Sequence, residues 1–109
     1  MIQATIFRNQ NGQYVGFDCI GHAGYAAAGE DIVCAGVSAL VFNTVNAIDR
    51  FTEEVFTAET KEETGEISVR FRSPVSHDAQ LLIDALLLGL QGIQKQYKTT
   101  YITLNFKEV

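Results

Sequence analysis

The stretch Ile67-Ser68-Val69-Arg70-Phe71-Arg72 alternates apolar and polar side chains without a break. Successive side chains of a β-strand point to opposite faces of a sheet. The pattern therefore predicts a strand with one packed face and one solvated face, as is typical of an antiparallel sheet that packs on one side.

Other segments of the sequence also have the residue pattern of strands. The other predicted strands are 1–8, 14–20, 55–60 and 102–107. Turn residues from Asn9 to Gly12 join the first two strands, and residues 61–65 form the turn before Glu66. The strand at 55–60 has the weakest alternation of the set.

Two longer segments have the spacing of amphipathic helices. The first is predicted to begin at Asp31, a residue favoured as N-cap, and to run to about Phe51. The second is predicted from about Ser76 to about Tyr97. The resulting order is β-β-α-β-β-α-β. We predict an α+β fold in one domain, residues 1–109: a two-layer sandwich with a largely antiparallel sheet and both helices on one face.

The second predicted helix carries more apolar surface than one sheet can cover. The stripe expected to face the sheet contains Ala79, Leu82, Leu86, Leu90, Ile93 and Tyr97. A second stripe beside it contains Leu81, Ala85, Leu88 and Gly92. Soluble proteins rarely leave such a patch bare, so the second stripe predicts a homodimer.

Composition limits the possible functions. The chain has 109 residues, of which 47% are hydrophobic and 19% charged, as in ordinary soluble domains. The formal net charge of −5 argues against direct nucleic-acid binding. No basic-then-apolar leader begins the sequence, and the uncharged run 32–48 reads as too short and polar to span a bilayer. We therefore expect a cytoplasmic protein without a membrane partner.

Acidic residues gather in one part of the chain. Six of the thirteen acids lie between Glu53 and Glu66, and Lys61 is the only opposing charge there. The segment is either a solvated hairpin or an acidic patch that attracts a cationic substrate.

The chemistry centres on two short blocks, Gly21-His22-Ala23-Gly24-Tyr25-Ala26 and Asp31-Ile32-Val33-Cys34-Ala35. A thiolate is a strong nucleophile and imidazole is the usual base that generates one. With Asp31 as N-cap, Cys34 would occupy the third helical position, where unpaired N–H groups favour an anion. The alternative is a structural Cys34 in the core and an exposed loop His22.

Neighbouring residues have two possible roles each. Asp31 either caps the helix or orients the imidazole of His22. Ser38, one helical turn beyond Cys34, either hydrogen-bonds the reacting groups or is a small core residue. Gly21 and Gly24 either admit a peptide backbone and expose N–H groups to an oxyanion, or only turn the chain.

Metal and redox chemistry are the remaining alternatives for the cysteines and histidines. Cys19, His22, Cys34 and His77 are suitable ligand types, but their spacing lacks the close pairs of zinc sites. The two cysteines also lack the CxxC spacing of thiol redox proteins. We expect no metal and no cofactor, with Cys19 packed in its strand and His77 on the surface.

The two blocks resemble the signature of the ribosomal-processing cysteine proteases called Prp. That signature is Gly-His-x-Gly-Tyr-Ala followed by Gly-x-Asp-Ile-Val-Cys-Ala-x-Val-Ser. The sequence matches it at Gly21, His22, Gly24, Tyr25, Ala26, Gly29, Asp31, Ile32, Val33, Cys34, Ala35, Val37 and Ser38.

This resemblance implies a catalytic His22–Cys34 dyad, supported by Asp31 and Ser38, in a homodimer. Gly21, Gly24 and Tyr25 would bind the substrate. The implied activity is removal of the N-terminal extension of a large-subunit ribosomal protein, the twenty-seventh, by cleavage after paired aromatic residues and before a small one. The alternative function is a non-enzymatic ribosome-assembly module.

Overall fold

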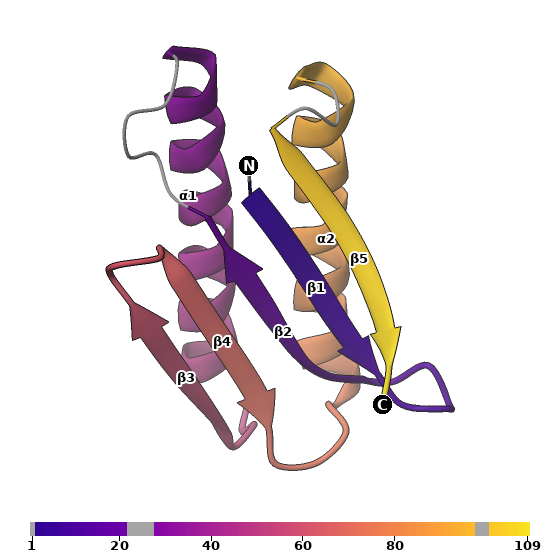
Figure 1. Ribbon diagram of the computed structural model, residues 1–109. Coiled ribbons are helices and arrows are strands. Elements are labelled where there is room, and N and C mark those ends of the chain that lie inside the picture. Colours follow the sequence, from indigo (N-terminus) through magenta and orange to yellow (C-terminus); the bar gives the residue numbers. More distant parts are fainter. Residues whose placement is uncertain (1, 22–27, 98–100) are drawn as a thin grey trace.

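A five-stranded sheet carries two long helices on one of its faces (Figure 1). The computed structural model describes residues 2–21, 28–97 and 101–109, apart from the side chains of 28–31. The elements are β1 (Ile2–Arg8), β2 (Tyr14–Ile20), α1 (Ala28–Phe51), β3 (Phe56–Lys61), β4 (Glu66–Phe71), α2 (His77–Tyr97) and β5 (Ile102–Glu108). The predicted element order and two-layer α+β architecture are confirmed.

The strands follow the order β3-β4-β2-β1-β5 across the sheet. Three neighbouring pairs are antiparallel, and β1 and β5 are parallel. The β1–β2 turn is closed by the Asn9 side chain, whose Oδ1 accepts hydrogen bonds from the backbone N–H groups of Asn11 and Gln13. Gly12 has a φ of 78°, which few other residues adopt readily.

The core lies between the sheet and the helices. Phe17, Val69, Ile83 and Ile102 are among its most deeply buried residues, with at most 1% of their surface exposed. They come from β2, β4, α2 and β5, so every layer contributes to one apolar cluster.

The buried face of α2 agrees only in part with the predicted stripe, since Ala79, Leu86 and Leu90 are buried as predicted. Ile83 and Leu87 are buried, whereas Leu82 and Ile93 are only partly covered. The prediction placed α2 against a sheet alone, but α2 also packs against α1, so its buried face turns towards that neighbour. The second predicted stripe is uncovered: Leu88 is 71% exposed.

The predicted start of the first helix was wrong by three residues. The helix α1 begins at Ala28, so Asp31 lies within it and is not its N-cap. Alanine has the highest helix propensity, and the helix extends back through Ala28 instead of stopping at the polar residue. Cys34 is consequently beyond the first turn, and the unpaired N–H groups at the helix start are not adjacent to it.

Residues 32–51 of α1 are long and apolar enough to cross a membrane by length and composition, contrary to the sequence-based expectation. Core helices of folded domains pass the same test. Here Val33, Val37, Val41 and Ile48 of α1 are buried in the common core. Packing in the core therefore accounts for one apolar face of this helix, whereas Ile32, Phe42 and Phe51 are exposed.

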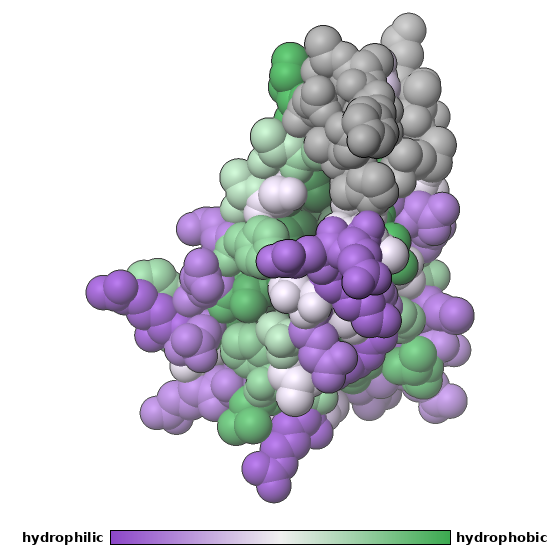
Figure 2. Space-filling model, turned by 60° about the vertical axis from the view of Figure 1, so that its left-hand side comes forward, coloured by the Kyte–Doolittle hydropathy of each residue, from purple (hydrophilic) through white to green (hydrophobic). Residues whose placement is uncertain are grey.

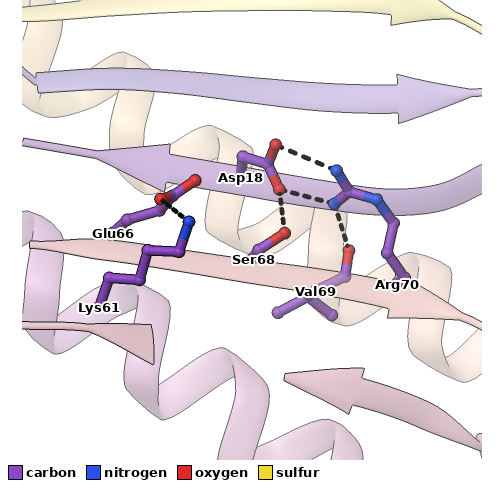
Figure 3. A network of polar contacts seen from close by, with 6 residues as sticks. All are labelled: Asp18, Lys61, Glu66, Ser68, Val69 and Arg70. Atoms are coloured by element: carbon purple, nitrogen blue, oxygen red, sulfur yellow. Dashed lines mark hydrogen bonds and ion pairs between the residues drawn. The ribbon is translucent and has the colours of Figure 1, made fainter. Parts of the chain in front are cut away.

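The opposite face of the sheet is polar and carries an ion-pair network (Figure 3). Arg70 donates to both carboxylate oxygens of Asp18, at 2.6 and 3.1 Å, and the Ser68 hydroxyl donates at 2.7 Å. Burial alone would raise the pKa of Asp18, but these hydrogen bonds outweigh it and the pKa is lowered. The network ties β2 to β4.

Candidate active site

A cavity of about 520 Å³ lies between α1 and the hairpin formed by β3 and β4. We call it the thiol cavity. Its lining includes Cys34, Ser38 and Phe42 from α1, Ile2, Cys19 and Gly21 from the ends of β1 and β2, and Thr60, Lys61, Glu62 and Glu66 from the hairpin. Three separate parts of the chain therefore build one recess around a thiol.

Cys34 and Ser38 lie one helical turn apart and both line the thiol cavity. Cys34 is 7% exposed, whereas Ser38 is an exposed residue. The interpretation of Ser38 as a small core residue is therefore wrong. Ser38 instead lines the same cavity as Cys34.

Gly21 directly follows β2 and lines the cavity. Its φ of 138° lies in the region that side chains with a Cβ rarely adopt. Gly21 therefore turns the chain at the cavity, and the next residue in the sequence is His22. His22, Gly24, Tyr25 and the side chain of Asp31 lie outside the described part of the structure, so their predicted roles stay predictions.

Cys19 is a further residue of the thiol cavity that the sequence analysis did not assign to the site. It is a buried strand residue, as predicted. Burial, together with the nearby Cys34 and Asp18 side chains, raises the pKa of the Cys19 thiol to about 11. Alternation along β2 showed that this side chain points inward, but not that a cavity lies there.

Cys34 is expected to react with iodoacetamide faster than Cys19 near neutral pH. Alkylation needs a thiolate, and a pKa of about 11 leaves Cys19 almost fully protonated. Peptide mass mapping after short exposures measures the two rates, with urea-unfolded protein as the control in which both thiols are accessible. Faster labelling of Cys19 would contradict the assignment of the reactive thiol.

The mouth of the cavity is asymmetric in charge. On the hairpin side, the Lys61 amine lies 3.6 Å from the Glu66 carboxylate (Figure 3). Glu62 also lines the cavity on this side. On the helix side, α1 has no charged residue between Ile32 and Ile48, and Phe42 is 47% exposed. Figure 2 shows apolar surface running down this face with hydrophilic residues on either side. The helix side of the cavity is therefore better suited to an apolar ligand than the hairpin side.

A thiol that lines a recess is one requirement of an enzyme that uses cysteine as its nucleophile. The comparison with known proteins gives the particular family. The family described as Cysteine protease Prp matches residues 1–103. The chain belongs to this family and is a cysteine protease.

Individual relatives support the same assignment. The ribosomal processing cysteine protease Prp of Bacillus subtilis is 36% identical over 102 residues, which cover 90% of this chain and 91% of the relative. The Staphylococcus aureus protein of the same name is 36% identical over 98% of this chain and 100% of its own length. Both names argue against the non-enzymatic alternative.

Solved structures agree with the fold. The essential ribosomal processing protease Prp from S. aureus in complex with a substrate peptide has a TM-score of 0.90 and 34% identity, covering 98% of this chain and 100% of that one. A second complex, with a covalently linked product peptide, has a TM-score of 0.87 and 36% identity, with the same coverage. The fold is therefore that of a known peptide-processing enzyme.

Proposed function

We propose that this protease removes the N-terminal extension of a large-subunit ribosomal protein, the twenty-seventh, in the cytoplasm during ribosome maturation. The observation that carries the proposal is the position of Cys34 at an apolar cavity large enough for bulky side chains. The relatives named as ribosomal processing proteases support the choice of substrate.

The proposed mechanism is acyl transfer through a His22–Cys34 dyad. The imidazole of His22 takes the proton of Cys34, and the thiolate attacks the scissile carbonyl carbon. Backbone N–H groups of the segment that contains Gly21 and Gly24 are proposed to stabilise the oxyanion next to Cys34. The tetrahedral intermediate expels the amine, which receives the proton from His22, and water then hydrolyses the thioester to release the carboxylic acid.

Specificity for paired aromatic residues fits the lining of the thiol cavity. Val37, Val41 and Ile67 provide a buried apolar floor, and Phe42 provides a half-exposed aromatic rim. Burial of a large aromatic side chain against such a floor stabilises the complex by about 2 kcal/mol. Gly21, Gly24 and Tyr25 are proposed to hold the peptide backbone next to Cys34.

Incubation with a synthetic peptide that spans the proposed cleavage site tests the function. We expect a single cut after two adjacent Phe residues and before Ala. The control peptide replaces both Phe residues by Asp and should remain intact. Failure of the folded enzyme to cut the first peptide, or equal cutting of both, would exclude this substrate class.

Asp31→Asn tests whether Asp31 orients His22. Because Asp31 lies inside α1, capping of the helix no longer explains it. We expect a fall in kcat of about 10-fold or more, since the amide cannot hold the imidazole in the required tautomer. Glu30→Gln, the preceding helical residue, removes the same charge as a matched control. Unchanged kcat in Asp31→Asn with normal helicity would exclude the orienting role.

The homodimer is part of the same proposal. Leu81 and Leu88 on α2 are 59% and 71% exposed, and a two-fold dimer would cover this stripe. We expect Leu88→Glu to dissociate the dimer at micromolar concentration, whereas Asn105→Glu on exposed β5 should not. Sedimentation velocity distinguishes the states. A wild-type monomer, or a stable Leu88→Glu dimer, would rule out this interface.

A further inference from the structure

The thiol cavity contains both cysteines of the chain. Cys19 comes from β2 and Cys34 from α1, and the two side chains are 8% and 7% exposed. Both carry thiols and are not joined by a disulfide. The proposed cleavage mechanism uses only one of them.

The surroundings of Cys19 make Cys34 its natural reaction partner. In the sheet, Cys19 is opposite Ala4 on one side and Ile67 on the other, both buried and chemically inert. Cys34 lines the same cavity as Cys19, and its charge contributes to the raised pKa of Cys19. No other thiol exists in the sequence to compete with either one.

We propose that Cys19 is a resolving thiol, which forms a reversible disulfide with Cys34 across the thiol cavity when a peroxide oxidises the enzyme. The inhibitory consequence rests on the proposed function of Cys34 as nucleophile. The bond would remove that nucleophile and occupy the apolar recess, while protecting Cys34 from irreversible oxidation.

The chemistry proceeds in two balanced steps. The Cys34 thiolate attacks hydrogen peroxide, so that the sulfur is oxidised to a sulfenic acid and hydroxide leaves. The released hydroxide takes the Cys19 proton, forming water, and the resulting Cys19 thiolate attacks the Cys34 sulfur, which forms the S–S bond and expels hydroxide. The raised pKa of Cys19 keeps it protonated, so the first oxidation falls on Cys34. A dithiol reductant reverses the bond.

Intact mass and thiol counting on dilute wild-type protein test the proposal independently of cleavage. After treatment with stoichiometric hydrogen peroxide, we expect a mass about 2 Da below the reduced monomer and the loss of both alkylatable thiols. Dithiothreitol should restore the original mass. If the peptide-cleavage proposal also holds, activity is lost and regained in parallel; if it fails, the mass result still stands.

Cys19→Ala and Cys19→Val provide the matched variants, each compared with its own untreated activity and thermal melt. Without Cys19, we expect peroxide to add about 32 Da at Cys34 as sulfinic acid, with no recovery in dithiothreitol. Either of two results in the wild-type protein would overturn the proposal: the same mass gain from sulfinic acid at Cys34, or a disulfide between two chains.

Discussion

Cys34→Ala is expected to abolish cleavage of the aromatic-pair peptide, with a fall in kcat of at least about 10³-fold. The substitution removes the only atom proposed to form the acyl-enzyme. It leaves a small apolar side chain at a position that is 7% exposed, so the fold should lose only about 1 kcal/mol of unfolding free energy. Peptide cleavage followed by mass spectrometry, together with a thermal melt, separates the two effects.

Two companion variants sharpen this result. Cys34→Ser keeps the size and a hydroxyl, which is a far weaker nucleophile than a thiolate, and should be nearly as inactive. Thr57→Ala, on the exposed edge strand β3, should cleave at the wild-type rate. Cleavage that persists in purified Cys34→Ala would remove Cys34 as the nucleophile.

His22→Ala is expected to lower kcat by about 10²- to 10⁴-fold, the usual contribution of a general base. The loss should be smaller at high pH, because an unassisted thiol with a pKa of about 8.5 ionises on its own. Combining His22→Ala with Cys34→Ala should add nothing to the single loss, since the two groups act as a unit.

The measurement is kcat against pH from 6 to 10 for the wild type and His22→Ala. His77→Ala is the matched control, because His77 is the other histidine and lies exposed at the start of α2. A His22→Ala enzyme with the wild-type rate and pH profile would refute the dyad.

Local pattern was sufficient to predict most of the elements. Strict alternation placed β4 within a residue of its ends, because period two is specific to strands with one packed face. The turn residues from Asn9 to Gly12 placed the start of β2. The start of α1 was missed because the capping preference of Asp31 competes with the helix propensity of Ala28. The buried face of α2 was predicted only in part, because α1 shares it, which one helical wheel cannot show.

Local sequence was also sufficient to predict part of the candidate site. Short motifs identified Cys34, Ser38 and Gly21, and the structure brings these three to one cavity. Cys19 was assigned only to the core, since the recess above it depends on how the β3–β4 hairpin meets α1. That contact joins residues far apart in the sequence, and neither composition nor periodicity encodes it.

The parallel pairing of β1 with β5 has a consequence for biosynthesis. Ile2 is paired with Ile102, so one edge of β1 stays uncovered until β5 has been synthesised. Until then β1 presents unpaired backbone groups that can recruit a strand from another chain. Nascent or truncated chains that lack 102–108 should therefore be prone to aggregation. The complete sheet can therefore form only after β5 has been synthesised and has left the ribosome, so we expect no protease activity from the nascent chain before that point.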